Sequence, residues 1–81
     1  MVNNLQLQRW KKNMSQKDVA DATGINLSTY SKYEIDALDI NKASLGNIIK
    51  ICLVLDCNLE DILSDDKLIK LVKKYQRKFK K

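Results

Sequence analysis

The chain has 81 residues, 44% of them hydrophobic, with two cysteines, no histidine and no proline. This length suits one small domain, and such domains bury only about 60% of their unfolded surface, which favours association with a second copy. No stretch approaches the roughly 18 consecutive apolar residues of a membrane span, and the N-terminus lacks the basic-then-apolar order of a signal peptide. We therefore expect a cytoplasmic protein without membrane attachment.

Catalysis and metal binding are not expected. The chain lacks histidine, a glycine-rich phosphate loop and a nucleophile elbow, so we expect no enzyme, no cofactor and no small-molecule substrate. Cys52 and Cys57 have apolar neighbours, which favours buried reduced thiols over a zinc site or a disulfide framework.

Charge is distributed unevenly along the chain. The net charge is +5, but residues 1–66 carry seven basic and ten acidic side chains, a net charge of −3. The last 15 residues carry eight positive charges and no negative one. Affinity for nucleic acid comes largely from Lys and Arg that displace counterions from phosphates. The C-terminal tail is therefore a candidate contributor to phosphate attraction.

The first helix is predicted from about Asn4 to Lys12, with Asn13 taking the left-handed conformation that asparagine tolerates. Leu5 and Arg9 fall on its inner face. Its other apolar residues, which do not fit that face, are Leu7 and Trp10.

Residues 15–34 predict two short helices joined by a tight turn. Ser15 suits an N-cap, and Asp18 three residues later completes a capping-box-like pattern, so a helix should begin at Gln16. Gly24 ends this helix, because glycine adopts the left-handed conformation without steric cost, and Asn26 caps the next. The inner faces and the corner between the helices consist of Val19, Ala20, Thr23, Ile25, Tyr30 and Tyr33.

Two further helices follow. Asn41 is the expected cap of the fourth, and Asn58 with Asp61 that of a short fifth. Apolar spacing assigns to the core Leu45, Ile48, Cys52, Leu55, Leu59, Ile62 and Leu63. The fourth helix has more apolar surface than one small core needs, namely Ile49, Ile51, Leu53 and Val54.

Residues 65–79 predict a basic amphipathic helix. Its apolar stripe comprises Leu68, Leu71, Val72, Tyr75 and Phe79, and lysines cover the other face. Three uses compete: packing on the domain or on a second subunit ranks first, contact with DNA phosphates second, and binding to an anionic membrane a distant third.

The motif at 15–34 resembles the helix-turn-helix of Cro and phage-repressor (XRE-like) transcriptional regulators. The resemblance covers roughly residues 4–63. Matching residue types are found at Leu5, Arg9, Met14, Ser15, Gln16, Val19, Ala20, Gly24, Ile25, Tyr30, Tyr33, Glu34, Leu45, Ile48, Ile51, Leu55, Leu59, Ile62 and Leu63. The segments DINKAS at 39–44 and LEDIL at 59–63 are similar to small regulators of low-GC Gram-positive bacteria and their mobile elements.

This resemblance implies an all-α fold. A compact five-helix repressor-like domain would span residues 1–64, and a basic amphipathic C-terminal helix would span 65–81. The resemblance also implies an ion pair between Arg9 and Glu34 that joins the first and third helices.

In a helix-turn-helix, the second helix of the motif lies in the major groove and the first crosses the backbone. The expected base-contacting residues are Leu27, Ser28, Thr29, Ser31 and Lys32, and the expected phosphate contacts are Gln16, Lys17 and Asn26. Outside this motif, the same serines and lysines would be interpreted as solvated surface.

Two functions remain open at this point. The first is a sequence-specific repressor or activator that binds double-stranded DNA as a homodimer on an inverted repeat. The second is a protein-interaction module, such as an antitoxin or antirepressor, that keeps the fold and binds another protein. The resemblance implies a loop with glycine and basic residues after the third helix, where this chain has Asp36 and Leu38. This loop and the acidic charge of residues 1–66 favour the second function slightly, whereas the intact motif favours the first more strongly. The expected dimer surface consists of Ile49, Leu53, Val54, Leu68, Val72 and Tyr75.

Overall fold

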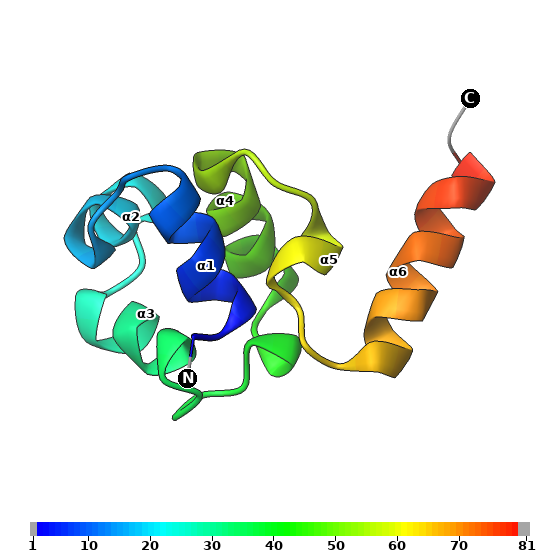
Figure 1. Ribbon diagram of the computed structural model, residues 1–81, viewed down its shortest axis with the longest axis horizontal. Helices are drawn as coiled ribbons and strands as arrows, with labels where there is room; N and C mark the ends of the chain where they lie inside the picture. Colours follow the sequence, from blue (N-terminus) through cyan, green and yellow to red (C-terminus); the bar gives the residue numbers. More distant parts are fainter. Residues whose placement is uncertain (1, 80–81) are drawn as a thin grey trace.

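The computed structural model describes residues 2–79, and all regular elements in that range are helical (Figure 1). They are α1 (Asn4–Lys11), α2 (Gln16–Thr23), α3 (Leu27–Glu34), the 3-10 turn η1 (Ile40–Lys42), α4 (Leu45–Leu55), α5 (Leu59–Ile62) and α6 (Asp66–Phe79). The all-helical prediction is confirmed.

Asparagines lie at both ends of the N-terminal helix. Asn3 is the N-cap of α1, because its Oδ1 accepts a hydrogen bond of 2.9 Å from the backbone N–H of Gln6. Asn13 follows the helix with φ of 54°, as predicted. Arg9 lies on the buried face, whereas Leu7 and Trp10 are exposed.

The predicted start of the fourth helix is wrong. Asn41 lies inside η1, and α4 begins only after Ser44, whose hydroxyl accepts a hydrogen bond from Asn47 N at 3.2 Å. The Asn41 side chain instead accepts from the backbone of Ser64 and Asp65. It therefore ties η1 to the start of the C-terminal segment rather than capping a helix.

The burial of two residues of α4 also differs from the prediction. Leu45, predicted in the core, is 65% exposed, and Ile51, counted among the surplus apolar residues, is fully buried. The other three predicted core residues of α4 are buried as expected.

One core joins the first five helices. Its largest fully buried side chains are Leu5, Val19, Tyr30, Ile51, Leu55 and Ile62. Each buried aliphatic side chain contributes about 1.5–3 kcal/mol to folding. Because α2 contacts both α3 and α4, the helix pair of the motif is held on a rigid support.

The C-terminal helix packs on this core through only part of its length. The Asp65 carboxylate accepts a hydrogen bond from Leu68 N at 3.1 Å and so caps α6. Leu68, Ile69 and Val72 pack against the core, and Gln76 donates a hydrogen bond of 3.2 Å to Glu60 of α5. The rest of its apolar stripe, Leu71, Tyr75 and Phe79, is exposed.

The particle measures 35 × 24 × 21 Å, and α3 and α6 lie toward opposite ends of its longest axis (Figure 1). None of the helices described between residues 2 and 79 has the length and apolar content needed to cross a bilayer.

Candidate nucleic-acid interface

The first helix of the motif begins at a reciprocal cap. Ser15 Oγ accepts a hydrogen bond from Asp18 N at 3.0 Å, and Asp18 Oδ2 accepts one from Ser15 N at 3.0 Å. The hydrogen bonds from Ser15 lower the pKa of Asp18, which therefore stays ionised near the positive end of α2. This cap fixes Gln16 as the first residue of the helix.

The turn between α2 and α3 has the predicted chemistry. Gly24 has φ of 74°, a conformation that disfavours residues with a Cβ. Ile25 is buried beneath the turn, and its N–H donates to Thr23 Oγ1 at 3.3 Å. Asn26 Oδ1 accepts from Ser28 N at 2.8 Å, so Asn26 caps α3. Hydrogen bonds from backbone N–H groups to the Thr23 and Asn26 side chains, with the burial of Ile25, thus fix the turn between the two helices.

The outer side of α3 is open to solvent. Leu27, Ser28 and Lys32 are exposed, whereas Thr29 is half-buried. Tyr30 and Tyr33 point inward and are buried, as predicted. The available side chains offer two hydroxyls, one ammonium and one aliphatic group, which are groups that can contact base edges.

A chain of polar contacts supports α3 from behind. Ser31 Oγ donates to Gln16 Oε1 at 2.8 Å, and Gln16 Nε2 donates to Glu34 Oε1 at 3.0 Å. Arg9 holds the same carboxylate from α1 with two hydrogen bonds, from Nε at 2.7 Å and from Nη2 at 2.9 Å. Arg9 Nη1 also donates to the carbonyl of Met14 at 2.9 Å. Side chains from α1 (Arg9) and α2 (Gln16) therefore meet at the buried Glu34 carboxylate of α3.

Burial and hydrogen bonding act in opposite directions on this carboxylate. Burial raises the pKa of Glu34, but the hydrogen bonds from Arg9 and Gln16 outweigh it and lower the pKa below its ordinary value. The hydrogen bond to Glu34 raises the pKa of Arg9. Tyr30 lies against the pair, and burial raises the pKa of its phenol, so the hydroxyl stays neutral. Glu34 is thus ionised and paired at neutral pH.

The Tyr30 hydroxyl is itself buried without a hydrogen-bond partner of good geometry within residues 2–79. Its ring fills the centre of the core, and apolar burial accounts for its position.

The residues predicted to contact phosphates differ in how far their polar groups are already engaged within the protein. Lys17 is exposed but pairs with Asp21 at 2.8 Å along α2. The Asn26 side-chain oxygen is occupied by its cap hydrogen bond, which leaves the amide NH₂ of this exposed residue for a phosphate. Gln16 is half-buried, with its oxygen and one amide N–H engaged inside the protein.

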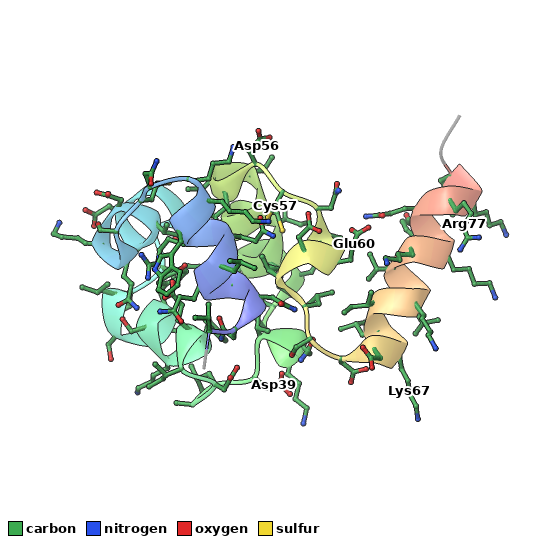
Figure 2. All side chains as sticks on the ribbon, in the orientation of Figure 1. Asp39, Asp56, Cys57, Glu60, Lys67 and Arg77 are labelled. Atoms are coloured by element: carbon green, nitrogen blue, oxygen red, sulfur yellow. The ribbon has the colours of Figure 1, made fainter. Side chains whose placement is uncertain are left out.

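The loop after α3 is acidic. Asp36 and Asp39 are exposed there, and Asp39 is visible at the lower edge of the body (Figure 2). The dense positive charge lies elsewhere, on α6, where Lys67 and Arg77 extend away from the body (Figure 2). The lysines of α6 therefore do not lie beside α3 in the single chain.

The end of α3 is anchored by a residue that the sequence analysis did not single out. Asn3 Nδ2 donates to the carbonyl of Tyr33 at 2.8 Å and to Asp36 Oδ1 at 3.2 Å. An asparagine just before a predicted helix start is typical of a cap, and that was the available signal. The hydrogen bond from Asn3 to the carbonyl of Tyr33 joins residues 30 positions apart, so no local sequence pattern predicts it.

The residues predicted to form a dimer surface are not all free. Ile49, Leu53 and Tyr75 are exposed. The remaining three are partly buried and pack on the chain's own core, namely Val54, Leu68 and Val72.

Neither cysteine is activated. Burial raises the pKa of Cys52 to about 12 and also raises the pKa of Cys57. Both are thus protonated at neutral pH, in which state thiols are poor nucleophiles and poor ligands. Within residues 2–79, no cluster of three or more potential ligand side chains is placed to hold a metal ion.

This geometry, two capped helices at a fixed angle with the second exposed along its outer side, defines the helix-turn-helix class of DNA-binding proteins. The family model described as "Helix-turn-helix" matches residues 5–62. The chain belongs to this family, and it is a DNA-binding regulator of the XRE type, the Cro and phage-repressor group. No curated protein and no solved structure gives a significant match.

Proposed function

We propose that the chain is a sequence-specific transcriptional repressor that reads the major groove with α3 and acts as a homodimer on an inverted repeat. The observation that carries this proposal is the support of α3 by the contacts from Ser31 through Gln16 and Glu34 to Arg9, while its outer side stays open. A surface ordered before binding loses less conformational entropy when it meets DNA.

The residues on α3 suit particular base edges. The Lys32 ammonium can donate to the O6 and N7 acceptors of guanine, and Leu27 can contact the methyl group of thymine. Ser28 and Thr29 can hydrogen-bond several bases, so they add less discrimination. We assign Ser31 to positioning, because its hydroxyl is engaged with Gln16.

Phosphate contacts would come from the N-terminal ends of α2 and α3. Gln16 retains one amide N–H beyond the one donated to Glu34, and free backbone N–H groups at helix starts attract anions. Lys17 and the Asn26 amide would add to this set. We place the protein in the cytoplasm, where a regulator of this kind meets DNA.

The small size of the domain and its uncovered apolar residues support the proposed homodimer. Two copies would place two α3 helices on half-sites about one helical turn, 34–36 Å, or a multiple of it, apart. A pseudo-palindromic operator is therefore expected.

The test is a titration of labelled DNA flanking the protein's own gene, at two salt concentrations, with unrelated DNA as competitor. A site bound at least about 1,000-fold better than competitor supports the proposal. Lys32→Ala should weaken that site and relax its sequence preference, whereas Lys50→Ala on α4 is the matched control and should leave both unchanged. Equal weak binding to all sequences would contradict sequence-specific regulation.

One observation favours a second candidate, a protein-interaction module. Asp36 and Asp39 follow α3 in a loop that would pass near DNA phosphates. Carboxylates there oppose phosphate approach, as expected if another protein were the partner. If neither the wild type nor the variants Asp36→Asn and Asp39→Asn bind DNA measurably, this candidate replaces the first.

A further inference from the structure

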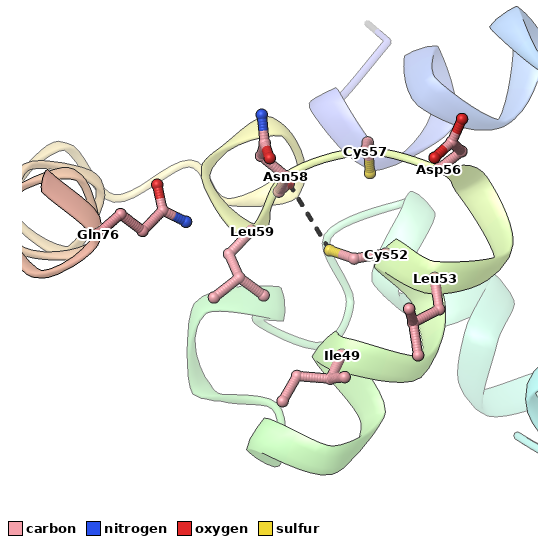
Figure 3. A pocket seen from close by; sticks show the side chains of 8 residues that line it. All are labelled: Ile49, Cys52, Leu53, Asp56, Cys57, Asn58, Leu59 and Gln76. Carbon is pink, nitrogen blue, oxygen red and sulfur yellow. Dashed lines mark hydrogen bonds between the residues drawn. The ribbon is translucent and has the colours of Figure 1, made fainter. Parts of the chain in front are cut away.

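An apolar groove runs between α4 and α6. It consists of two hollows, of about 260 Å³ and 170 Å³, that share Leu59 as a lining residue. Figure 3 shows Ile49 and Leu53 on the α4 side of the larger hollow, Leu59 on its α5 side, and Gln76 reaching toward it from α6. The smaller hollow continues between Leu45 of α4 and Val72 of α6. We call this feature the α4–α6 groove.

The two helices that flank the groove carry apolar side chains that the single chain leaves uncovered. On α4 these are Leu45, Ile49 and Leu53, and on α6 they are Leu71, Tyr75 and Phe79, with exposed fractions between 41% and 76%. The rings of Tyr75 and Phe79 lie 5.0 Å apart and form one aromatic surface. These six residues are distinct from the outer side of α3, so DNA reading does not explain them.

We propose that the α4–α6 groove receives the exposed stripe of α6 from a second copy of this chain, and that the second copy receives the first copy's α6 in return. The inference deepens the homodimer of the proposed function and rests on it. It assigns the contact to α6 against α4, where the sequence had indicated only a set of apolar residues.

Charge favours a second copy over other helical partners. Among the side chains that line the two hollows, the one formal charge is the negative charge of Asp56, whose carboxylate is largely exposed and pairs with Lys12 at 3.5 Å. Glu60 adds a second negative charge close by, through its hydrogen bond with Gln76. A helix that enters should therefore combine an apolar stripe with basic flanks. The chain's own α6 has this combination, whereas an acidic amphipathic helix would meet like charge at Asp56.

Symmetry and area support the same occupant. A twofold dimer needs one patch that is complementary to itself, and here each copy offers both a groove and a stripe. With roughly 100 Å² exposed per residue, six residues sum to about 600 Å² per copy and about 1,200 Å² across both, the lower end of stable interfaces.

The first test is sedimentation of the full chain without DNA, from low micromolar to several hundred micromolar. We expect a monomer–dimer equilibrium. Leu53→Glu and Tyr75→Glu should each raise the dimer dissociation constant at least tenfold, and Leu7→Glu, at an exposed apolar residue of α1, is the matched control. All three sites are exposed, so helicity measured by circular dichroism should not change. A chain that stays monomeric throughout overturns the proposal.

Mixing the two variants tests which helices meet. If α6 of one copy contacts α4 of the other, a mixed dimer of Leu53→Glu with Tyr75→Glu keeps one undamaged contact and forms more tightly than either variant alone. If α4 meets α4 and α6 meets α6, mixing gives no gain, and the proposed arrangement is wrong.

Two further measurements distinguish this dimer contact from lipid binding and from DNA binding. Monomeric protein that binds phosphatidylglycerol vesicles through Tyr75 would assign the stripe to a lipid surface and overturn the proposal. Because Tyr75→Glu should be largely monomeric, its affinity for a single half-site measures DNA reading by α3 without the dimer contact. A dimer that Leu53→Glu and Tyr75→Glu weaken but that binds no DNA supports the groove contact and contradicts the proposed function. A strict monomer that binds a half-site supports DNA reading by α3 and contradicts both the groove contact and the proposed homodimer.

Discussion

The hydroxyl of Ser31 donates a 2.8 Å hydrogen bond to the side-chain oxygen of Gln16, and this contact joins the outer flank of α3 to the first turn of α2. The two residues are 15 positions apart, and both are half-buried. Through Gln16 the contact continues to the buried pair of Glu34 and Arg9. The orientation of α3 is therefore coupled to α1, which does not touch its outer side.

Removal of this contact should weaken DNA binding without unfolding the protein. Ser31→Ala and Gln16→Ala should each lower affinity for the operator about five- to tenfold, since one hydrogen bond contributes about 1 kcal/mol. The double variant should lose less than the sum of the two free-energy changes, because the residues act through one contact. Fluorescence anisotropy with labelled operator measures the cycle, and Ser64→Ala, far from the motif, is the control. Strict additivity would contradict the coupling.

Arg9→Ala should destabilise the fold strongly. It leaves the Glu34 carboxylate buried without its main partner, which costs about 3–5 kcal/mol in comparable pairs. Lys12 and Asp56 form an exposed pair at 3.5 Å, so Lys12→Ala should cost less than about 1 kcal/mol. Urea unfolding followed by circular dichroism compares the two. Equal losses would show that burial of the first pair has no energetic consequence.

The stability contribution of Glu34 should depend on pH. Its pKa is lower in the folded chain than the ordinary value of 4.5, so its ionised form stabilises the fold above that pH. As the pH falls below about 4.5 and through the folded pKa, this contribution is lost. The difference in urea midpoint between the wild type and Glu34→Gln should be constant near neutral pH and should shrink in acid. A difference that grows in acid would reverse the sign.

The two glycines should respond oppositely to alanine. Gly24 has φ of 74°, so Gly24→Ala should destabilise by about 1–2 kcal/mol although no atom lies within 4 Å of the new Cβ. Gly46 lies within α4 with equal space, so Gly46→Ala should stabilise by about 0.5–1 kcal/mol. Thermal unfolding of both variants measures the signs. Loss of stability in both would contradict backbone conformation as the deciding factor.

Local sequence rules predicted the motif well. Ser15, Asp18, Gly24 and Asn26 act within four residues of their own positions, so their roles can be read without knowledge of the fold. The capping residue Asn58 is similar, because its N–H donates to the Asp61 carboxylate at 2.9 Å.

Contacts between distant segments explain what local rules missed. Asn41 and Ser44 are both good caps, but Ser44 caps α4, whereas the side chain of Asn41 accepts hydrogen bonds from the backbone at residues 64 and 65. Leu45 is the first residue of α4 and is exposed, whereas Ile51 shares the buried face with Ile48, Cys52 and Leu55. The candidate base-contacting residues could be placed on the outer side of α3 in advance, but the engagement of Ser31 by Gln16 depends on the angle between two helices.

The distance between α3 and α6 along the longest axis has an evolutionary consequence. Under the proposed function, in which α3 reads DNA and α6 forms the subunit contact, substitutions at one end need not disturb the other, so target choice and choice of companion subunit can change separately. A duplicated gene can thus keep its operators while its product ceases to mix with that of the parent.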